Sequence, residues 1–95
     1  MPQHLASHVE IIAHAHGRWH LRAPGQREPG PKQIMAILNN MLRLGVQPDP
    51  DCTVWVPVTK WLSAICQPQF DGTWLVITYK LHGAWQKYER REIAE

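Results

Sequence analysis

Polar and apolar residues alternate almost without interruption between positions 8 and 22. The odd positions hold Val9, Ile11, Ala13, Ala15, Gly17, Trp19 and Leu21, while the even positions are mostly His, Glu and Arg. A repeat of two predicts a β-strand, because successive side chains of a strand point to opposite faces. Residues 8–22 exceed the usual strand length of about 3–10 residues, so they are predicted to form a β-hairpin that turns at His16-Gly17-Arg18. A three-residue loop keeps the apolar face continuous, whereas a two-residue loop would place Arg18 on it.

A loop and then a helix are predicted next. Residues 22–31 contain three prolines and two glycines, which predicts an exposed loop that is either functional or only a connector. Pro31 suits the first turn of a helix, and Gly45 suits its end. The main helix is therefore predicted over residues 31–44. Its apolar stripe consists of Ile34, Ile37, Leu38, Met41 and Leu42.

The second half of the chain is predicted to contain strands and one short helix. Residues 53–58 are β-branched and aromatic, which predicts a strand. Pro57 predicts that this strand lies at an edge or ends near that point, because proline donates no ladder hydrogen bond. Residues 59–67 are predicted to form a short helix that Thr59 caps and Pro68 ends. Residues 73–91 predict a second β-hairpin, with an apolar central strand over 73–81 and a charged edge strand after the turn.

Together these elements predict a single α+β domain over residues 1–95. A twisted antiparallel sheet of four to five strands would consist of the N-terminal hairpin, the middle strand and the C-terminal hairpin. It would pack against one main amphipathic helix, with the short helix as a second one. The predicted core is Val9, Ile11, Trp19, Leu21, Ile34, Ile37, Leu38, Met41, Val54, Val56, Leu62, Ile65, Leu75, Ile77 and Tyr79.

Composition narrows the functional classes only partly. The 95 residues carry a net charge of +2, which excludes an acidic mimic of DNA, and 44% are hydrophobic, which argues against disorder. The five tryptophans suit both a small core and a binding surface. No apolar stretch approaches the length of about 20 residues that a membrane span needs, and the first residues lack the pattern of a signal peptide. We therefore expect a cytoplasmic protein in which Cys52 and Cys66 are reduced thiols.

Histidines and potential nucleophiles are the candidates for chemistry. His14, His16 and His20 would share the polar face of the predicted hairpin, where imidazoles can bind Zn²⁺ or another transition metal. No cysteine or carboxylate stands at a diagnostic spacing from them, so a plain polar sheet face is the alternative and no cofactor is expected. The candidate nucleophiles are Ser7, Ser63, Cys52 and Cys66, but no known catalytic signature surrounds them. We expect no enzymatic activity and no catalytic residues.

Basic and aromatic side chains are the predicted contact residues. They are Arg18, Arg22, Arg27, Lys32, His20, Trp85, Tyr88, Arg90 and Arg91. We expect a small protein-interaction module whose partner is a protein or a nucleoprotein complex, not a membrane. One specific form of this hypothesis is a phage-encoded or mobile-element-encoded inhibitor of a host defence complex. The charged last strand would pair with a partner's edge or with its own copy in a homodimer.

Two other functions remain open from the sequence. One is a nucleic-acid-binding domain that uses a basic and aromatic sheet face, on which bases stack and phosphates are neutralised. The other is a His-rich metal-binding protein.

Overall fold

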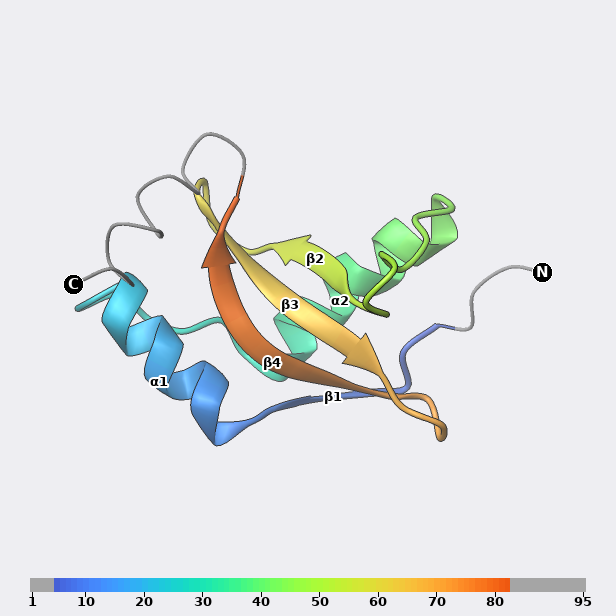
Figure 1. The fold of residues 1–95 in the computed structure, drawn as a ribbon, viewed down its shortest axis with the longest axis horizontal. Coiled ribbons are helices and arrows are strands. Elements are labelled where there is room, and N and C mark those ends of the chain that lie inside the picture. The colour runs from blue at the N-terminus through green and yellow to red at the C-terminus, as the bar shows by residue number, and fades with distance from the viewer. Residues whose placement is uncertain (1–4, 83–95) are drawn as a thin grey trace.

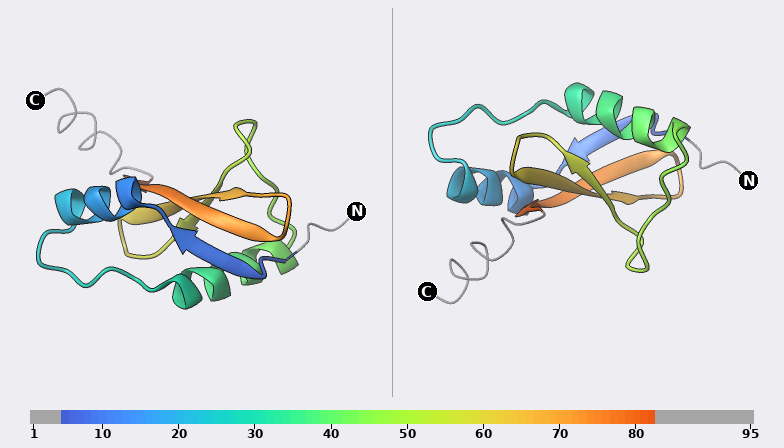
Figure 2. Two further views of the ribbon diagram at one scale, coloured as in Figure 1. Left: turned by 90° about the horizontal axis from the view of Figure 1, so that it is seen from below. Right: turned by 90° about the horizontal axis from the view of Figure 1, so that it is seen from above.

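One four-stranded sheet and two helices make up the part of the chain that the computed structural model describes, residues 5–82 (Figure 1). This arrangement confirms the predicted small α+β fold. Helix α2 lies across one face of the sheet, and helix α1 packs at one end against β4 (Figures 1 and 2). In chain order the elements are β1 (His8–Ile11), α1 (Ala13–Arg22), α2 (Pro31–Arg43), β2 (Val54–Pro57), β3 (Leu62–Pro68) and β4 (Thr73–Leu81).

The sheet is mixed, with the strand order β1-β4-β3-β2. The β2–β3 and β3–β4 pairs are antiparallel, but β1 pairs with β4 in parallel. The prediction of a wholly antiparallel sheet is therefore wrong. Both helices and the β2–β3 hairpin separate β1 from β4 in the chain, and a parallel pair requires a long connection of this kind. Strand β2 does lie at an edge, as Pro57 led us to expect.

The predicted N-terminal hairpin over residues 8–22 is also wrong, because only its first part is a strand and the rest is helix α1. Ala15 and Trp19 are buried in α1, and Ala23 is buried just after it. Positions four apart lie on one face of a helix, yet they also fit an alternation of two. The same apolar residues thus satisfied both patterns. Leu21 was expected in the core but is 59% exposed, because the helix turns it toward solvent.

The short helix predicted over residues 59–67 is strand β3 instead. Thr59 does accept hydrogen bonds from the backbone N–H groups of Trp61 and Leu62, at 3.3 Å and 2.9 Å. These bonds close the turn between β2 and β3 and do not start a helix. Residues 62–66 are buried on both faces because β3 is an internal strand, so they lack the alternation that marks a half-exposed strand.

The main helix is confirmed as α2. It begins at Pro31 and ends at Arg43, with Leu44 as its C-cap, and Gly45, which follows, has a φ of 91°. The N–H groups of Gly45 and Val46 donate to the carbonyls of Leu42 and Met41, both at 3.1 Å, which satisfies carbonyls of the last turn.

A β-bulge in β4 decides which of its residues are in the core. Cys66 pairs with Val76, but Ile65 pairs with Thr78, so Ile77 is an extra residue in the ladder. Trp74 and Val76 are buried before it, and Tyr79 and Leu81 are buried after it. Of the residues of β4 that were predicted for the core, Tyr79 is therefore buried, but Leu75 and Ile77 are only partly buried and lie outside the main core cluster.

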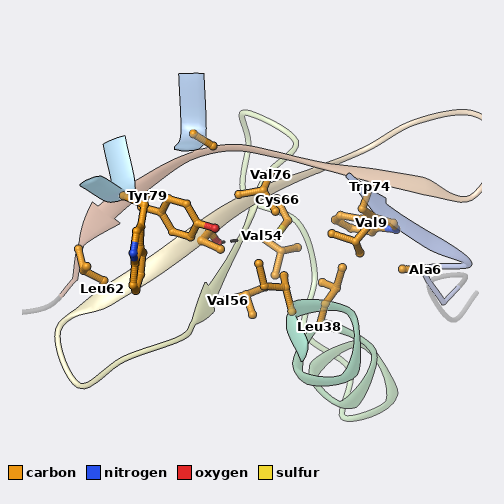
Figure 3. Close-up of a cluster of buried hydrophobic side chains, with 14 of the residues drawn as sticks. Ala6, Val9, Leu38, Val54, Val56, Leu62, Cys66, Trp74, Val76 and Tyr79 are labelled. Atoms are coloured by element: carbon orange, nitrogen blue, oxygen red, sulfur yellow. Dashed lines mark hydrogen bonds between the residues drawn. The ribbon is translucent and has the colours of Figure 1, made fainter. Parts of the chain in front are cut away.

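One hydrophobic core joins the sheet to both helices. Leu38 of α2 points toward Val54 and Val56 of β2, and Val9 lies next to Trp74 (Figure 3). At the α1 end, Trp19 packs edge-on against Tyr79, with ring centroids 5.1 Å apart. Trp19 also donates a hydrogen bond from its indole nitrogen to a backbone carbonyl in the loop that follows α1. The core residues, including those that the sequence did not single out, are Ala6, Val9, Ala15, Trp19, Ala23, Ile34, Leu38, Leu42, Val54, Val56, Leu62, Ala64, Cys66, Trp74, Val76, Tyr79 and Leu81.

Candidate functional site

The basic residues that were predicted to share one sheet face are spread around helix α1. Successive residues of a helix are about 100° apart, so His14 and Arg18 lie on one flank and His16 and His20 on the other. Arg18 Nε donates a hydrogen bond to His14 Nε2 at 3.3 Å. His16, on the opposite flank, is held by Glu28, its Nδ1 lying 2.7 Å from Oε1. The structure therefore does not bring these residues together as one contact surface.

The other predicted contact residues lie apart from α1. Arg27 is exposed in the loop between the helices and lines a cavity of about 330 Å³ with Glu28 and Gln33. Lys32 is exposed in the first turn of α2 and lines a different groove. Trp85, Tyr88, Arg90 and Arg91, together with the predicted last strand, lie outside the described residues.

The predicted metal ligands do not converge within the described part of the chain. No group of three or more His, Cys, Asp or Glu side chains there is arranged to hold a metal ion. His16 and His20 are four residues apart on one flank of α1, but His14 lies on the other flank. Neither helix between residues 5 and 82 has the length and apolarity needed to cross a membrane.

Glu28 connects three elements of the fold. Its carboxylate pairs with His16 of α1 and accepts a hydrogen bond from the hydroxyl of Tyr79 in β4 at 2.9 Å. Burial and the neighbouring carboxylate hold the pKa of Tyr79 far above its usual range, so the phenol stays protonated and keeps donating. The loop between α1 and α2 is therefore tied to the core through Glu28, and its two predicted roles, a functional loop or only a connector, both stay predictions.

Ser63, one of the candidate nucleophiles, is hydrogen-bonded to His82. Its Oγ lies 2.7 Å from His82 Nδ1, and His82 Nε2 lies 2.9 Å from the carbonyl oxygen of Lys60. The carbonyl can only accept, so Nε2 carries the proton and Nδ1 accepts from the serine hydroxyl. This is how a nucleophile and its base are paired. However, Ser63 is 2% exposed, which closes Oγ to a substrate in this structure, and the pair serves to join the ends of β3 and β4.

The cysteines are both free, Cys52 at the surface and Cys66 in the core. Burial raises the pKa of Cys66 to about 12. A thiol with so high a pKa is not ionised near neutral pH and is a poor nucleophile.

Strand β1 is one of the two edge strands of the sheet within the described residues, and its outer edge is open. Strand β1 ends the sheet on one side, and its only neighbouring strand within residues 5–82 is β4 (Figure 1). The N–H of Ile12 donates to the carbonyl of Val76 at 3.2 Å. Alternate residues of a parallel strand face the neighbour, so Glu10 has the same orientation as Ile12. The N–H and C=O groups of Val9 and Ile11 consequently point away from the sheet.

The chain bends just before β1, and helix α2 occupies the edge there. Ser7 lies at this bend, and its N–H donates to the carbonyl of Gly72 at 2.9 Å. The side-chain amide of Asn39 makes both backbone hydrogen bonds of Ala6, accepting from its N–H at 2.7 Å and donating to its C=O at 3.0 Å. This amide does what a neighbouring strand would do. The edge is thus satisfied at Ala6 but open at β1.

A groove runs between this open edge and the start of α2, and we call it the β1–α2 groove. Its volume is about 530 Å³. Val9, which is buried, and Met35, which is partly buried, provide apolar walls. The full lining consists of Ser7, His8, Val9, Gly30, Pro31, Lys32 and Met35.

The charge of the β1–α2 groove is positive. Lys32 forms no ion pair with any residue between 5 and 82, and the first turn of α2 contains no acidic residue. The N-terminal end of a helix also carries a partial positive charge. The side chains of His8, which also borders the groove, and of Glu10 alternate with that of Val9 along β1, and both are exposed and lie 3.5 Å apart.

The sheet face opposite α2 carries a second, smaller apolar group. Trp55, Ile65 and Thr78 are cross-strand neighbours on β2, β3 and β4. Lys80 lies over the Trp55 ring, with Nζ 5.9 Å from the ring centroid. Ile65 is 3% exposed although it lies outside the main core cluster.

Comparisons with known proteins do not add to this description. No protein-family model matches the chain, and neither a curated protein nor a solved structure resembles it closely enough to count as a match. The candidate site therefore depends on its own geometry.

Of the residues that form the β1–α2 groove, only Lys32 was predicted as a contact residue. Val9 was predicted for the core, where it does lie, and Met35 was not predicted as a contact residue. The available signal was Ile12, the one apolar residue at an even position between 8 and 22, because an interruption of the alternation there is compatible with a short edge strand followed by a helix. Which groups of that strand remain open depends on the parallel pairing with β4, and a distant pairing is not encoded in the local pattern.

Proposed function

We propose that this chain is a non-enzymatic protein-interaction module that binds a partner along the free edge of β1. The observation that carries the proposal is the combination of outward-facing backbone groups at Val9 and Ile11 with an apolar groove beside them. Exposed strand edges bind extended segments of other proteins, because main-chain hydrogen bonds supply affinity and adjacent pockets supply specificity. The edge is short, as exposed edges in monomeric proteins usually are.

Site-specific cross-linking tests this proposal and does not require the partner to be identified first. A photoreactive benzoylphenylalanine replaces Lys32 at the groove or, as the matched control, Lys60 in the turn between β2 and β3. Both lysines are exposed. We expect a cross-linked protein from position 32 that is absent from position 60. The Met35→Glu substitution should abolish it by placing a charge in the apolar wall, whereas Ala36→Glu, at the exposed neighbouring position, should not.

Two results would count against the proposal. One is the same set of cross-linked proteins from positions 32 and 60. The other is a product that survives Met35→Glu in a variant that melts within about 5 °C of wild type, which shows that the fold is intact. A purified partner should then slow hydrogen exchange at the amides of Val9 and Ile11. The amides of Glu10 and Ile12 serve as internal controls, because they already face β4.

Nucleic-acid binding through α1 is the second candidate. Helix α1 contains His14, His16, Arg18, His20 and Arg22 and no acidic residue. A basic helix of this kind would bind phosphates with an affinity that falls steeply with salt. A duplex or single strand that binds at 50 mM salt, weakens at 200 mM and is lost with Arg18→Ala would favour this candidate. No binding at 50 mM salt would exclude it.

The narrower hypothesis of an inhibitor of a host defence complex stays a prediction. It is motivated by the small size of the chain. If it is correct, the protein cross-linked from position 32 should be a subunit of such a complex, and adding the purified chain should reduce the activity of that complex.

A further inference from the structure

We infer that the β1–α2 groove takes an extended, acidic segment of a partner protein, which adds to β1 as a further strand and inserts one apolar side chain between Val9 and Met35. This inference rests on the proposed function and specifies the ligand of the same site.

The backbone of β1 sets the position of the added strand. The outward N–H and C=O groups of Val9 and Ile11 offer two donors and two acceptors, spaced as in a ladder. Asn39 already occupies the edge at Ala6, and helix α1 begins at Ala13. The added strand is therefore confined to the length of β1.

The side chains of the added strand follow from this register. A residue directly opposite Val9 has its side chain on the same face of the sheet as Val9. That face is the one covered by α2, so the side chain enters the groove beside Met35. The residues before and after it point to the other face, where the exposed His8 and Glu10 tolerate polar groups.

The charge of the groove selects an acidic segment. Among the described lining residues, Lys32 alone carries a formal charge at neutral pH when His8 is neutral, and no acidic residue in the first turn of α2 offsets it. A residue two positions from the apolar one is on the same face. An acidic side chain there meets the positive side of the groove, and a basic one is repelled.

Synthetic peptides with blocked ends test these requirements on the full chain. The probe is Thr-Asp-Thr-Leu-Thr-Asp-Thr, which reads the same in both directions and so needs no assumption about strand polarity. One comparison peptide has Lys in place of both Asp residues, and another has Ala in place of Leu. Binding is followed by the amide resonances and hydrogen exchange of Val9 and Ile11, with Glu10 and Ile12 as controls.

We expect the Asp peptide to bind at least about fivefold more tightly than either comparison peptide and to protect the amides of Val9 and Ile11. Lys32→Glu should reverse the order of the Asp and Lys peptides. Lys60→Glu changes the net charge equally but lies away from the groove, so it should leave the order unchanged.

Several outcomes would overturn the inference. Equal binding of the Asp and Lys peptides, with protection at β1, would remove the acidic preference and leave the proposed function intact. A lack of protection with every peptide would remove strand addition as the binding mode. If protection of Val9 and Ile11 instead rises with protein concentration and the chain sediments as a dimer, the occupant is a second copy and not a partner segment. The cross-linking experiment replaces Lys32 and so removes the charge that selects an acidic segment, and it therefore tests partner binding at the groove apart from that preference.

Discussion

Replacing Gly72 with alanine should destabilise the fold for two reasons that can be separated. Gly72 ends the turn between β3 and β4 with a φ of 86°, a conformation that costs an alanine roughly 1–2 kcal/mol. A Cβ at this position would also lie 2.7 Å from Ser7 Oγ. That hydroxyl donates to the Gly72 carbonyl at 3.1 Å, so it must rotate away and give up the hydrogen bond.

Gly45 is the matched control for this prediction. It has a φ of 91°, but a Cβ there meets nothing within 4 Å. Alanine also restricts the unfolded chain, which returns part of the conformational cost. We therefore expect Gly45→Ala to lower the free energy of unfolding by about 1 kcal/mol. Gly72→Ala should lower it by about 2 kcal/mol, the difference being one exposed hydrogen bond and the forced rotation of Ser7.

Urea denaturation followed by tryptophan fluorescence measures these free energies, provided that the slope with urea is the same for all variants. In the double variant Gly72→Ala with Ser7→Ala, the close contact disappears, while the backbone cost and the loss of the Ser7 hydrogen bond remain. The double variant should therefore be about as stable as Gly72→Ala alone, although Ser7→Ala by itself is destabilising. If Gly72→Ala lowers the free energy of unfolding no more than Gly45→Ala does, the argument from the Ser7 contact is refuted. It is also refuted if the effects of Gly72→Ala and Ser7→Ala simply add in the double variant.

Three further predictions concern thiol reactivity, pH dependence and a buried hydrogen bond. In native protein at pH 8 a thiol reagent should label Cys52 only, because Cys66 is buried and burial raises its pKa to about 12. Denaturant should expose the thiol of Cys66 as well. Labelling of both cysteines at the same rate in native protein would contradict this prediction. Backbone and side-chain hydrogen bonds hold the pKa of Asp71 below its usual value, so its charge stabilises the fold at neutral pH, and this contribution is lost as the pH falls below about 4. The stability difference between wild type and Asp71→Asn should therefore shrink on acidification, and a constant difference from pH 7 to 3 would refute it. Tyr79→Phe removes the hydrogen bond to Glu28 and should cost about 1.5 kcal/mol in urea denaturation, whereas no loss would show that water replaces the hydroxyl.

The parts of the fold that were predictable have patterns that only one kind of element produces. The stripe from Ile34 to Leu42 fits a helix and does not fit a strand, so α2 was found with its start correct and its end placed one residue too late. The apolar residues around Trp19 are two and four apart, and that spacing satisfies both a strand and a helix. The choice between them is made by packing, since Trp19 and Ala15 pack onto the sheet through α1.

The candidate site was less predictable than the fold because it depends on distant pairings. The bulge at Ile77 shifts the buried positions of β4 by one residue, and it is visible only in the pairing of β4 with β3, not in the apolar pattern of β4 itself. Similarly, the open groups of β1 follow from its parallel pairing with β4, about 65 positions further along the chain. The sequence did supply Lys32 as a contact residue, because an exposed charge at the start of a helix can be recognised locally.

The clasp of Asn39 on Ala6 has a consequence for how long any complex at this edge would last. The hydrogen bonds between Asn39 and Ala6 shorten the open edge of the sheet to β1, with α2 at one end and α1 at the other. Only a few main-chain hydrogen bonds to a partner can form along so short an edge. Stable complexes generally bury about 1,200–2,000 Å² in total, and so brief a contact buries much less. Association there would be fast and readily reversed, suited to a partner that is sampled repeatedly or that is held through additional surfaces at the same time.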